Sequence, residues 1–345
     1  MAAIVATAVW TFLDRRRNNY IKLHKWFRVF LRFALASQML VYGFMKVFAL
    51  QMSSPDLLKL VELYGNFSPM AVLWTSIGVA PAYRFFAGSA ELLGGLLLLL
   101  PVTSMLGALV CAADMAMVFV LNMSYDVPVK ILSFHLLLIA LFLLAPDVRR
   151  LIDFFFTNRA TAARGGPQLF QGMRANRLAL ACQLLLGAYL AGFTLQKDIQ
   201  YWYEWGGGSP KPALYGIWEV KEMAIDGQVR PSLLTDAQRW RRVIFESFGD
   251  IEIQGMDESV LYFKSFQQAS MLNLDDKGPF PIVGYPGHPG LSGKFAIDRL
   301  APDELTLDGT MGGHNIHTEL RRVDLRQFTL VSRGFHWISE YPFQR

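Results

Sequence analysis

Residues 205–212 read Trp-Gly-Gly-Gly-Ser-Pro-Lys-Pro, and this stretch divides the chain into two parts of different character. Three consecutive glycines leave the backbone flexible and two prolines favour an extended exit, as is typical of a linker between separately folded parts. Apolar runs long enough to cross a bilayer precede it, whereas short alternating runs follow it. The sequence therefore predicts a membrane helical bundle at residues 27–200, a linker at residues 201–212 and a β-domain at residues 213–345.

Five apolar runs before the linker are each near the length that a membrane-spanning helix needs. A helix rises about 1.5 Å per residue, so about 20 residues cross about 30 Å of hydrocarbon. The fourth run is the shortest and, standing alone, would fit a buried helix of a soluble protein, but its neighbours favour a span. We predict spans at residues 27–50, 83–102, 103–122, 130–146 and 177–195.

Basic residues flank these runs on one predicted side of the membrane. One group lies between Arg15 and Arg28, before the first span, and a second lies between Arg149 and Arg177. Because basic flanks stay in the cytoplasm, we expect the amino terminus inside and the β-domain outside, which in a bacterium means an inner-membrane protein with a periplasmic domain. Residues 1–26 are expected to form a cytoplasmic segment lying in the membrane interface. These flanks account for the net charge of +5, so no nucleic-acid partner is predicted.

Two carboxylates, Glu91 and Asp114, lie near the midpoints of the second and third spans. An ionisable group inside a bilayer costs several kcal/mol unless it is paired or hydrated. Almost no loop joins the two spans, so the acids are expected at the same depth. Three outcomes stay open for each acid: it is protonated and merely hydrogen-bonded, it pairs with a base, or it relays protons or contacts a quinone-like ligand. Gly88, Gly94 and Gly95 around Glu91 favour tight helix packing over an open pore.

Polar side chains of the first and fourth spans form two further candidate sites. Arg32 and Lys46 fall on one stripe of the first span, and Arg32 is near enough to the inner end to extend to water. Lys46 lies one turn from the outer end, at a depth similar to that of His135. With Asp126 and Lys130 of the neighbouring loop, these two are candidates for a polar pocket on the outer face. The alternative is an interfacial lysine and a histidine bonded to a neighbouring helix.

After the linker, about nine short runs alternate between apolar and polar residues. Such a meander usually closes on itself because closure removes its edges, so we predict an all-β barrel rather than a sandwich or an open sheet. Residues 279–293 hold four glycines and four prolines and are predicted to form a long loop. The strands are expected at residues 215–223, 242–246, 250–256, 260–266, 271–274, 294–299, 304–310, 315–322 and 328–332.

The first expected strand carries Gly216-Ile217-Trp218. This motif resembles the glycine-x-tryptophan signature of lipocalin-like barrels. The resemblance implies that Trp218 closes one end of the barrel and that an arginine from the last strand packs over it. Arg333, just after the last expected strand, is at a matching place.

The sequence indicates neither a metal site nor an enzyme motif. His314 and His317 have an odd spacing, which would point them to opposite faces of one strand, so no metal site is predicted. The sequence holds no nucleophile elbow, phosphate-binding glycine loop or dinucleotide fingerprint, and it leaves open whether the protein is an enzyme.

The bundle resembles the DoxX-like membrane proteins over about residues 26–150. The likeness rests on Arg32 and Gly43-Phe44-Met45-Lys46 in the first span, and on the run from Glu91 to Leu96 in a four-span core. Members of that group are associated with quinone-reducing sulfur enzymes and membrane oxidoreductase complexes. Lys46 and Glu91 match the family's pattern, whereas Asp114, the fifth span and the outer domain depart from it.

Together these patterns predict an accessory or redox-associated membrane protein that handles a lipophilic ligand, a quinone or a lipid, with the barrel as receptor or docking module. The alternative is a non-enzymatic assembly factor or scaffold whose barrel binds a membrane or periplasmic protein partner.

Overall fold

The computed structural model describes residues 2–15, 19–157, 159–160, 168–265, 280–284 and 291–343. The chain forms two compact units. The helical unit comprises residues 1–51 and 82–202, and the β unit comprises residues 52–81 and 203–345. The glycine-rich linker is therefore not the only boundary, because residues 52–81 also leave the helical unit and join the β unit.

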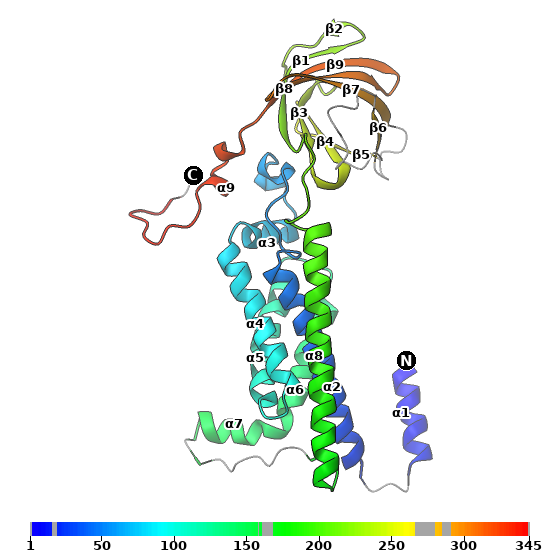
Figure 1. Ribbon diagram of the computed structural model, residues 1–345, viewed down its shortest axis with the longest axis vertical. Coiled ribbons are helices and arrows are strands. Elements are labelled where there is room, and N and C mark those ends of the chain that lie inside the picture. The colour runs from blue at the N-terminus through cyan, green and yellow to red at the C-terminus, as the bar shows by residue number, and fades with distance from the viewer. Residues whose placement is uncertain are drawn as a thin grey trace. The chain divides into compact units, whose positions relative to one another are not determined.

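The helical unit is an α-helical bundle (Figure 1). In the described part of the chain, four helical stretches are long and apolar enough to cross a membrane, and they overlap the second to fifth predicted spans: Pro81–Leu99, Ser104–Ser124, Lys130–Phe155 and Met173–Glu204. The first predicted span lies largely in α2, which has 27 residues but carries Arg32 and Lys46, so its crossing of the membrane stays a prediction. The helices are α1 (Ala2–Leu13), α2 (Ile21–Val47), α4 (Pro81–Leu99), α5 (Ser104–Ser124), α6 (Lys130–Leu144), α7 (Val148–Phe155) and α8 (Met173–Glu204), with η3 (Ala145–Asp147) joining α6 to α7.

Glycines allow α2 and α4 to pack with their backbones close together. A Cβ added to Gly43 would come within 2.9 Å of the Gly88 carbonyl oxygen, and one added to Gly88 within 2.8 Å of the Gly43 carbonyl oxygen. Around this crossing, buried apolar side chains such as Leu35, Met39 and Leu98 fill the core. The bundle is packed closely here, as the small residues around Glu91 predict.

The β unit contains a closed antiparallel barrel, which confirms the predicted fold class. The strand order is β2-β1-β3-β4-β5-β6-β7-β8-β9, and β1 also pairs with β9, so eight strands close the barrel while β2 extends β1 as a hairpin. The strands are β1 (Gly216–Ile225), β2 (Gln228–Val229), β3 (Trp240–Phe245), β4 (Asp250–Gly255), β5 (Val260–Ser265), β6 (Phe280–Gly284), β7 (Ser292–Ala301), β8 (Glu304–Met311) and β9 (His314–Arg322), with η4 (Ser247–Gly249) between β3 and β4.

Two stretches of the β unit differ from the sequence-based prediction. Residues 328–332 do not form the last strand: they lie at α9 (Thr329–Ser332), which follows η6 (Leu325–Gln327), because β1 already has β9 as its neighbour on that side. The predicted loop at residues 279–293 contains β6, whose Phe280 and Ile282 are buried in the barrel core. The strand predicted at residues 271–274 lies outside the described residues.

The barrel interior is filled with side chains. Trp240, Phe280 and Phe295 pack with branched aliphatic residues in one continuous core. The cavity that these aromatic residues border measures about 10 Å³, which leaves space for about one water molecule at most. This part of the barrel has no room for a lipophilic ligand.

The segment between the first two predicted spans packs on the barrel. It contains η1 (Leu58–Leu60), η2 (Tyr64–Asn66) and α3 (Pro69–Gly78). Leu57 and Leu58 are buried against Ile217 of β1 and Ile244 of β3. Tertiary packing thus places this loop in the β unit, although the sequence position of residues 52–81 lies within the helical part.

Candidate functional site

An ion pair between α2 and α4 lies inside the helical bundle. The Lys46 Nζ atom is 2.5 Å from the Glu91 Oε1 atom, and the two side chains are only 9% and 2% exposed. Asp114 of α5 interacts electrostatically with both charged groups. In the described part of the chain, the Glu91 Oε2 and Asp114 Oδ2 atoms are buried and have no hydrogen-bond partner. One ammonium group balances one carboxylate, so this cluster is neutral only when one of the acids carries a proton.

The same glycines that bring α2 and α4 together make this pair possible. A Cβ at Gly88 would lie 2.8 Å from the Cβ of Lys46, which is closer than packed side chains approach. The Tyr42 ring lies one turn away, with its centroid 6.0 Å from the Lys46 Nζ atom. Sequence reasoning named Lys46 and Glu91 as separate candidates, and the structure brings them together.

The predicted outer-face pocket is divided into separate local contacts. Lys46 pairs with Glu91, whereas Lys130 at the start of α6 bonds to Asp126 in the loop before it. The hydrogen bond from Lys130 lowers the pKa of the exposed Asp126 carboxyl group. His135 bonds through Nδ1 to the backbone oxygen of Ile131 in its own helix, at 2.7 Å. Each of the four candidates therefore has a partner of its own, and the pocket that they would form together stays a prediction.

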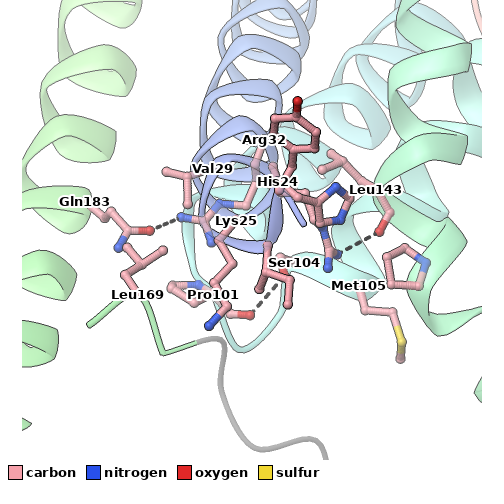
Figure 2. A pocket seen from close by; sticks show the side chains of 14 residues that line it. His24, Lys25, Val29, Arg32, Pro101, Ser104, Met105, Leu143, Leu169 and Gln183 are labelled. Atoms are coloured by element: carbon pink, nitrogen blue, oxygen red, sulfur yellow. Dashed lines mark hydrogen bonds between the residues drawn. The ribbon is translucent and has the colours of Figure 1, made fainter. Parts of the chain in front are cut away.

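A cavity of about 560 Å³ lies at the end of the helical unit where α2 begins. Its lining comes from α2, the turn between α4 and α5, α5, the end of α6, and α8 (Figure 2). The Arg32 Nη2 atom donates a hydrogen bond to the Gln183 side chain of α8. Arg28 donates to the Leu143 carbonyl oxygen at 3.0 Å, and Lys25 donates to the Gln168 carbonyl oxygen at 3.1 Å.

The sequence led us to expect that Arg32 extends to water. In the structure its side chain is instead only 6% exposed and bonds to α8. Sequence reasoning overlooked Gln183. A glutamine inside an otherwise apolar span was the available signal for it, since a polar group at membrane depth needs a partner.

One end of the barrel is organised around Trp218. Its ring is 1% exposed, and its Nε1 atom donates to the Leu214 carbonyl oxygen at 2.9 Å. Gly216, at φ +152°, leaves room for the Arg322 side chain, whose Cζ atom lies 5.8 Å from the Trp218 ring centroid. Arg322 therefore replaces Arg333 as the arginine over this tryptophan, because the last strand ends at Arg322. Arg333 instead lies over the Phe343 ring.

A group of acids lies where the loop before α3 packs on the barrel. The Leu57 backbone N–H donates to the Glu246 carboxylate. Burial raises the pKa of Glu252 to about 8, and the negative charges of Glu246 and Asp56 add to this rise. Sequence reasoning missed the group because its members are brought together only when the loop packs on β3 and β4.

The described residues contain no group of three His, Cys, Asp or Glu side chains placed to hold a metal ion. His314 and His317 instead bond through Nδ1 to Asp226 and Asp308, at 2.7 and 2.6 Å.

The fold and the buried charges define a class: a membrane protein in which an α-helical bundle is joined to a closed antiparallel β-barrel. The chain belongs to the same family as the uncharacterized protein YwoB of Bacillus subtilis (strain 168). The two are 31% identical over 138 residues, which cover 37% of this chain and 79% of the relative. No protein-family model and no solved structure matches the chain.

Proposed function

We propose that this protein binds a lipophilic ligand, a quinone or a lipid, within its helical bundle. The cavity of about 560 Å³ carries this proposal. Its volume falls in the range of about 300–1,000 Å³ that is usual for small-molecule sites. Val29, Met105 and Leu143 supply apolar lining, while Arg32 and Gln183 supply polar groups that orient a ligand.

The cluster of Lys46, Glu91 and Asp114 is the second element of the proposal. The ion pair joins α2 to α4, Asp114 of α5 interacts electrostatically with both of its charges, and the two acids supply a place for a proton inside the bundle. A quinone takes up protons when it is reduced, so such a cluster suits a redox-associated accessory protein. The resemblance of residues 26–150 to DoxX-like proteins supports the same class of ligand.

The basic flanks support an orientation for this function. We place the bundle in a bacterial inner membrane, with the amino terminus in the cytoplasm and the barrel in the periplasm. Residues 1–26 then belong to the cytoplasmic face, and α1 is an apolar helix suited to the membrane interface.

Extraction of the purified protein followed by mass spectrometry tests the proposal. Val29→Trp fills the cavity, and Leu93→Trp is the matched control because Leu93 is 53% exposed on α4. We expect wild type and the control to carry a lipid or quinone in stoichiometric amount, and Val29→Trp to carry much less. Equal amounts in all three proteins, or no lipophile in wild type, would contradict the proposal.

A second candidate is an assembly factor or scaffold whose barrel binds a membrane or periplasmic protein. The filled barrel interior favours it, because this interior leaves the outer surface of the barrel for recognition. Crosslinking in intact membranes distinguishes the two: a reproducible protein adduct on the barrel, with no lipophile in the purified bundle, supports the scaffold.

A further inference from the structure

We infer that the ligand of the bundle cavity is an amphiphile with an anionic phosphate head group, and that Arg32 recognises this head group. The inference rests on the proposed function, because it names the chemistry of the lipophilic ligand proposed for the same cavity. It goes further by assigning a charge to that ligand and a role to a residue of α2.

The first observation is the incomplete bonding of a buried cation. Arg32 lines the cavity and is 6% exposed. Its Nη2 atom donates to Gln183, which is a neutral acceptor, and its Nε atom is buried without a partner in the described part of the chain. A buried guanidinium group that lacks both a counter-charge and a full set of acceptors is costly to keep.

The second observation is the charge of the lining. Lys25 and Arg28 join Arg32 there, and they bond to the neutral carbonyl oxygens of Gln168 and Leu143. None of the described lining residues is an aspartate or a glutamate. The described lining thus carries three cationic side chains and no carboxylate, a composition that suits an anionic ligand.

The third observation is that the lining combines polar and apolar side chains. Figure 2 shows Arg32 and Gln183 bonded to each other, with Val29, Met105 and Leu143 also lining the cavity. An arginine fork matches the oxygen atoms of a phosphate group, and the apolar side chains suit acyl chains. The combination fits a phospholipid better than a free phosphate ion, which would leave the apolar walls uncovered.

Native mass spectrometry of the full-length protein in detergent tests the inference with three probes. These are phosphatidylglycerol, phosphatidylcholine with the same acyl chains, and inorganic phosphate. We expect wild type to prefer phosphatidylglycerol over phosphatidylcholine by about tenfold or more, which is what one charge-assisted hydrogen bond provides. Inorganic phosphate alone is expected to bind only weakly.

Two variants locate the preference. Arg32→Gln should lower the preference to near unity, whereas Arg149→Gln should retain it, because Arg149 is exposed on α7 and does not line the cavity. Arg28→Gln leaves Arg32 in place and should lower the preference by a few fold. This variant and Arg32→Lys provide the comparison if Arg32→Gln does not fold.

The outcomes distinguish the two proposals. Equal binding of both phospholipids, or retention of a neutral quinone alone, overturns the inference and leaves the proposed lipophile binding standing. Binding of inorganic phosphate but of neither lipid overturns both. A preference for phosphatidylglycerol that survives both Arg28→Gln and loss of the Arg32 guanidinium overturns the role of this cluster.

Discussion

Removing one partner of the Lys46–Glu91 pair should destabilise the bundle more than removing both. The relevant variants are Lys46→Met, Glu91→Gln and the double variant. With side chains 9% and 2% exposed and charged atoms 2.5 Å apart, each single substitution leaves a buried charge without its principal partner. Breaking such a pair costs about 3–5 kcal/mol, whereas replacing both groups by uncharged ones is often close to neutral.

Asp114 modifies these values in a predictable direction. In Glu91→Gln the ammonium group keeps Asp114 as a neighbouring counter-charge. We therefore expect the free energy of unfolding of this variant to fall by about 3 kcal/mol, at the lower end of the range for a broken buried pair. The double variant should lose less stability than either single variant, which corresponds to a coupling energy of at least about 3 kcal/mol.

Reversible unfolding in mixed detergent–SDS micelles, followed by far-ultraviolet circular dichroism, measures these free energies. The control cycle uses Lys130→Met and Asp126→Asn, since the Asp126 side chain is 82% exposed. Exposed ion pairs contribute little to stability, so this cycle should give no measurable coupling. Additive losses in the Lys46–Glu91 cycle, or single losses no larger than those of the control, would refute the reasoning.

Three further perturbations follow from the structure. Gly88→Val should cost about 1–3 kcal/mol in the same unfolding assay, because its side chain would displace Lys46; a loss below 0.5 kcal/mol, roughly the size of a surface substitution, would contradict the close crossing. Glu252 has a pKa of about 8 in the folded protein, against 4.5 when exposed, so the folded state binds this proton more tightly than the unfolded state. The free energy of unfolding of the β unit should therefore fall by on the order of 2 kcal/mol as the pH rises from 4.5 to 8, after allowance for partial exposure. Glu252→Gln should remove this dependence on pH in thermal melts followed by tryptophan fluorescence. An unchanged pH dependence would disprove the raised pKa of Glu252. Arg322→Met should lower the stability of the barrel by about 1–2 kcal/mol, whereas Arg333→Met should leave it unchanged. A larger loss in Arg333→Met than in Arg322→Met would instead support Arg333 as the arginine that packs over Trp218.

The helical spans and the closed barrel could be predicted because their signals are local. Span length is set by the thickness of the bilayer, and β-strands are indicated by the alternation of apolar and polar residues over a few positions. Strand ends depend instead on how the barrel closes. Residues 328–332 are as apolar as a strand, but β9 had already closed the barrel at Arg322. At β6, Pro281 and the surrounding glycines concealed the alternation of Phe280 and Ile282.

The pairing of side chains within the bundle required the structure. Lys46 and Glu91 are 45 residues apart, and their contact depends on which faces of α2 and α4 meet. Gly43 and Gly88 decide this by allowing the two backbones to approach. The sequence showed that small residues lie near Glu91, but it did not show which helix they would admit.

The packing of residues 52–81 with the barrel changes how the β unit is tethered. The chain passes between the two units at residues 51–52, 81–82 and 202–203, so three covalent connections join them. A protease that cuts the glycines at residues 206–208 therefore removes only one tether. The barrel fragment should stay with the membrane through the buried contacts of Leu57 and Leu58, and mild denaturant, rather than cleavage alone, should release it.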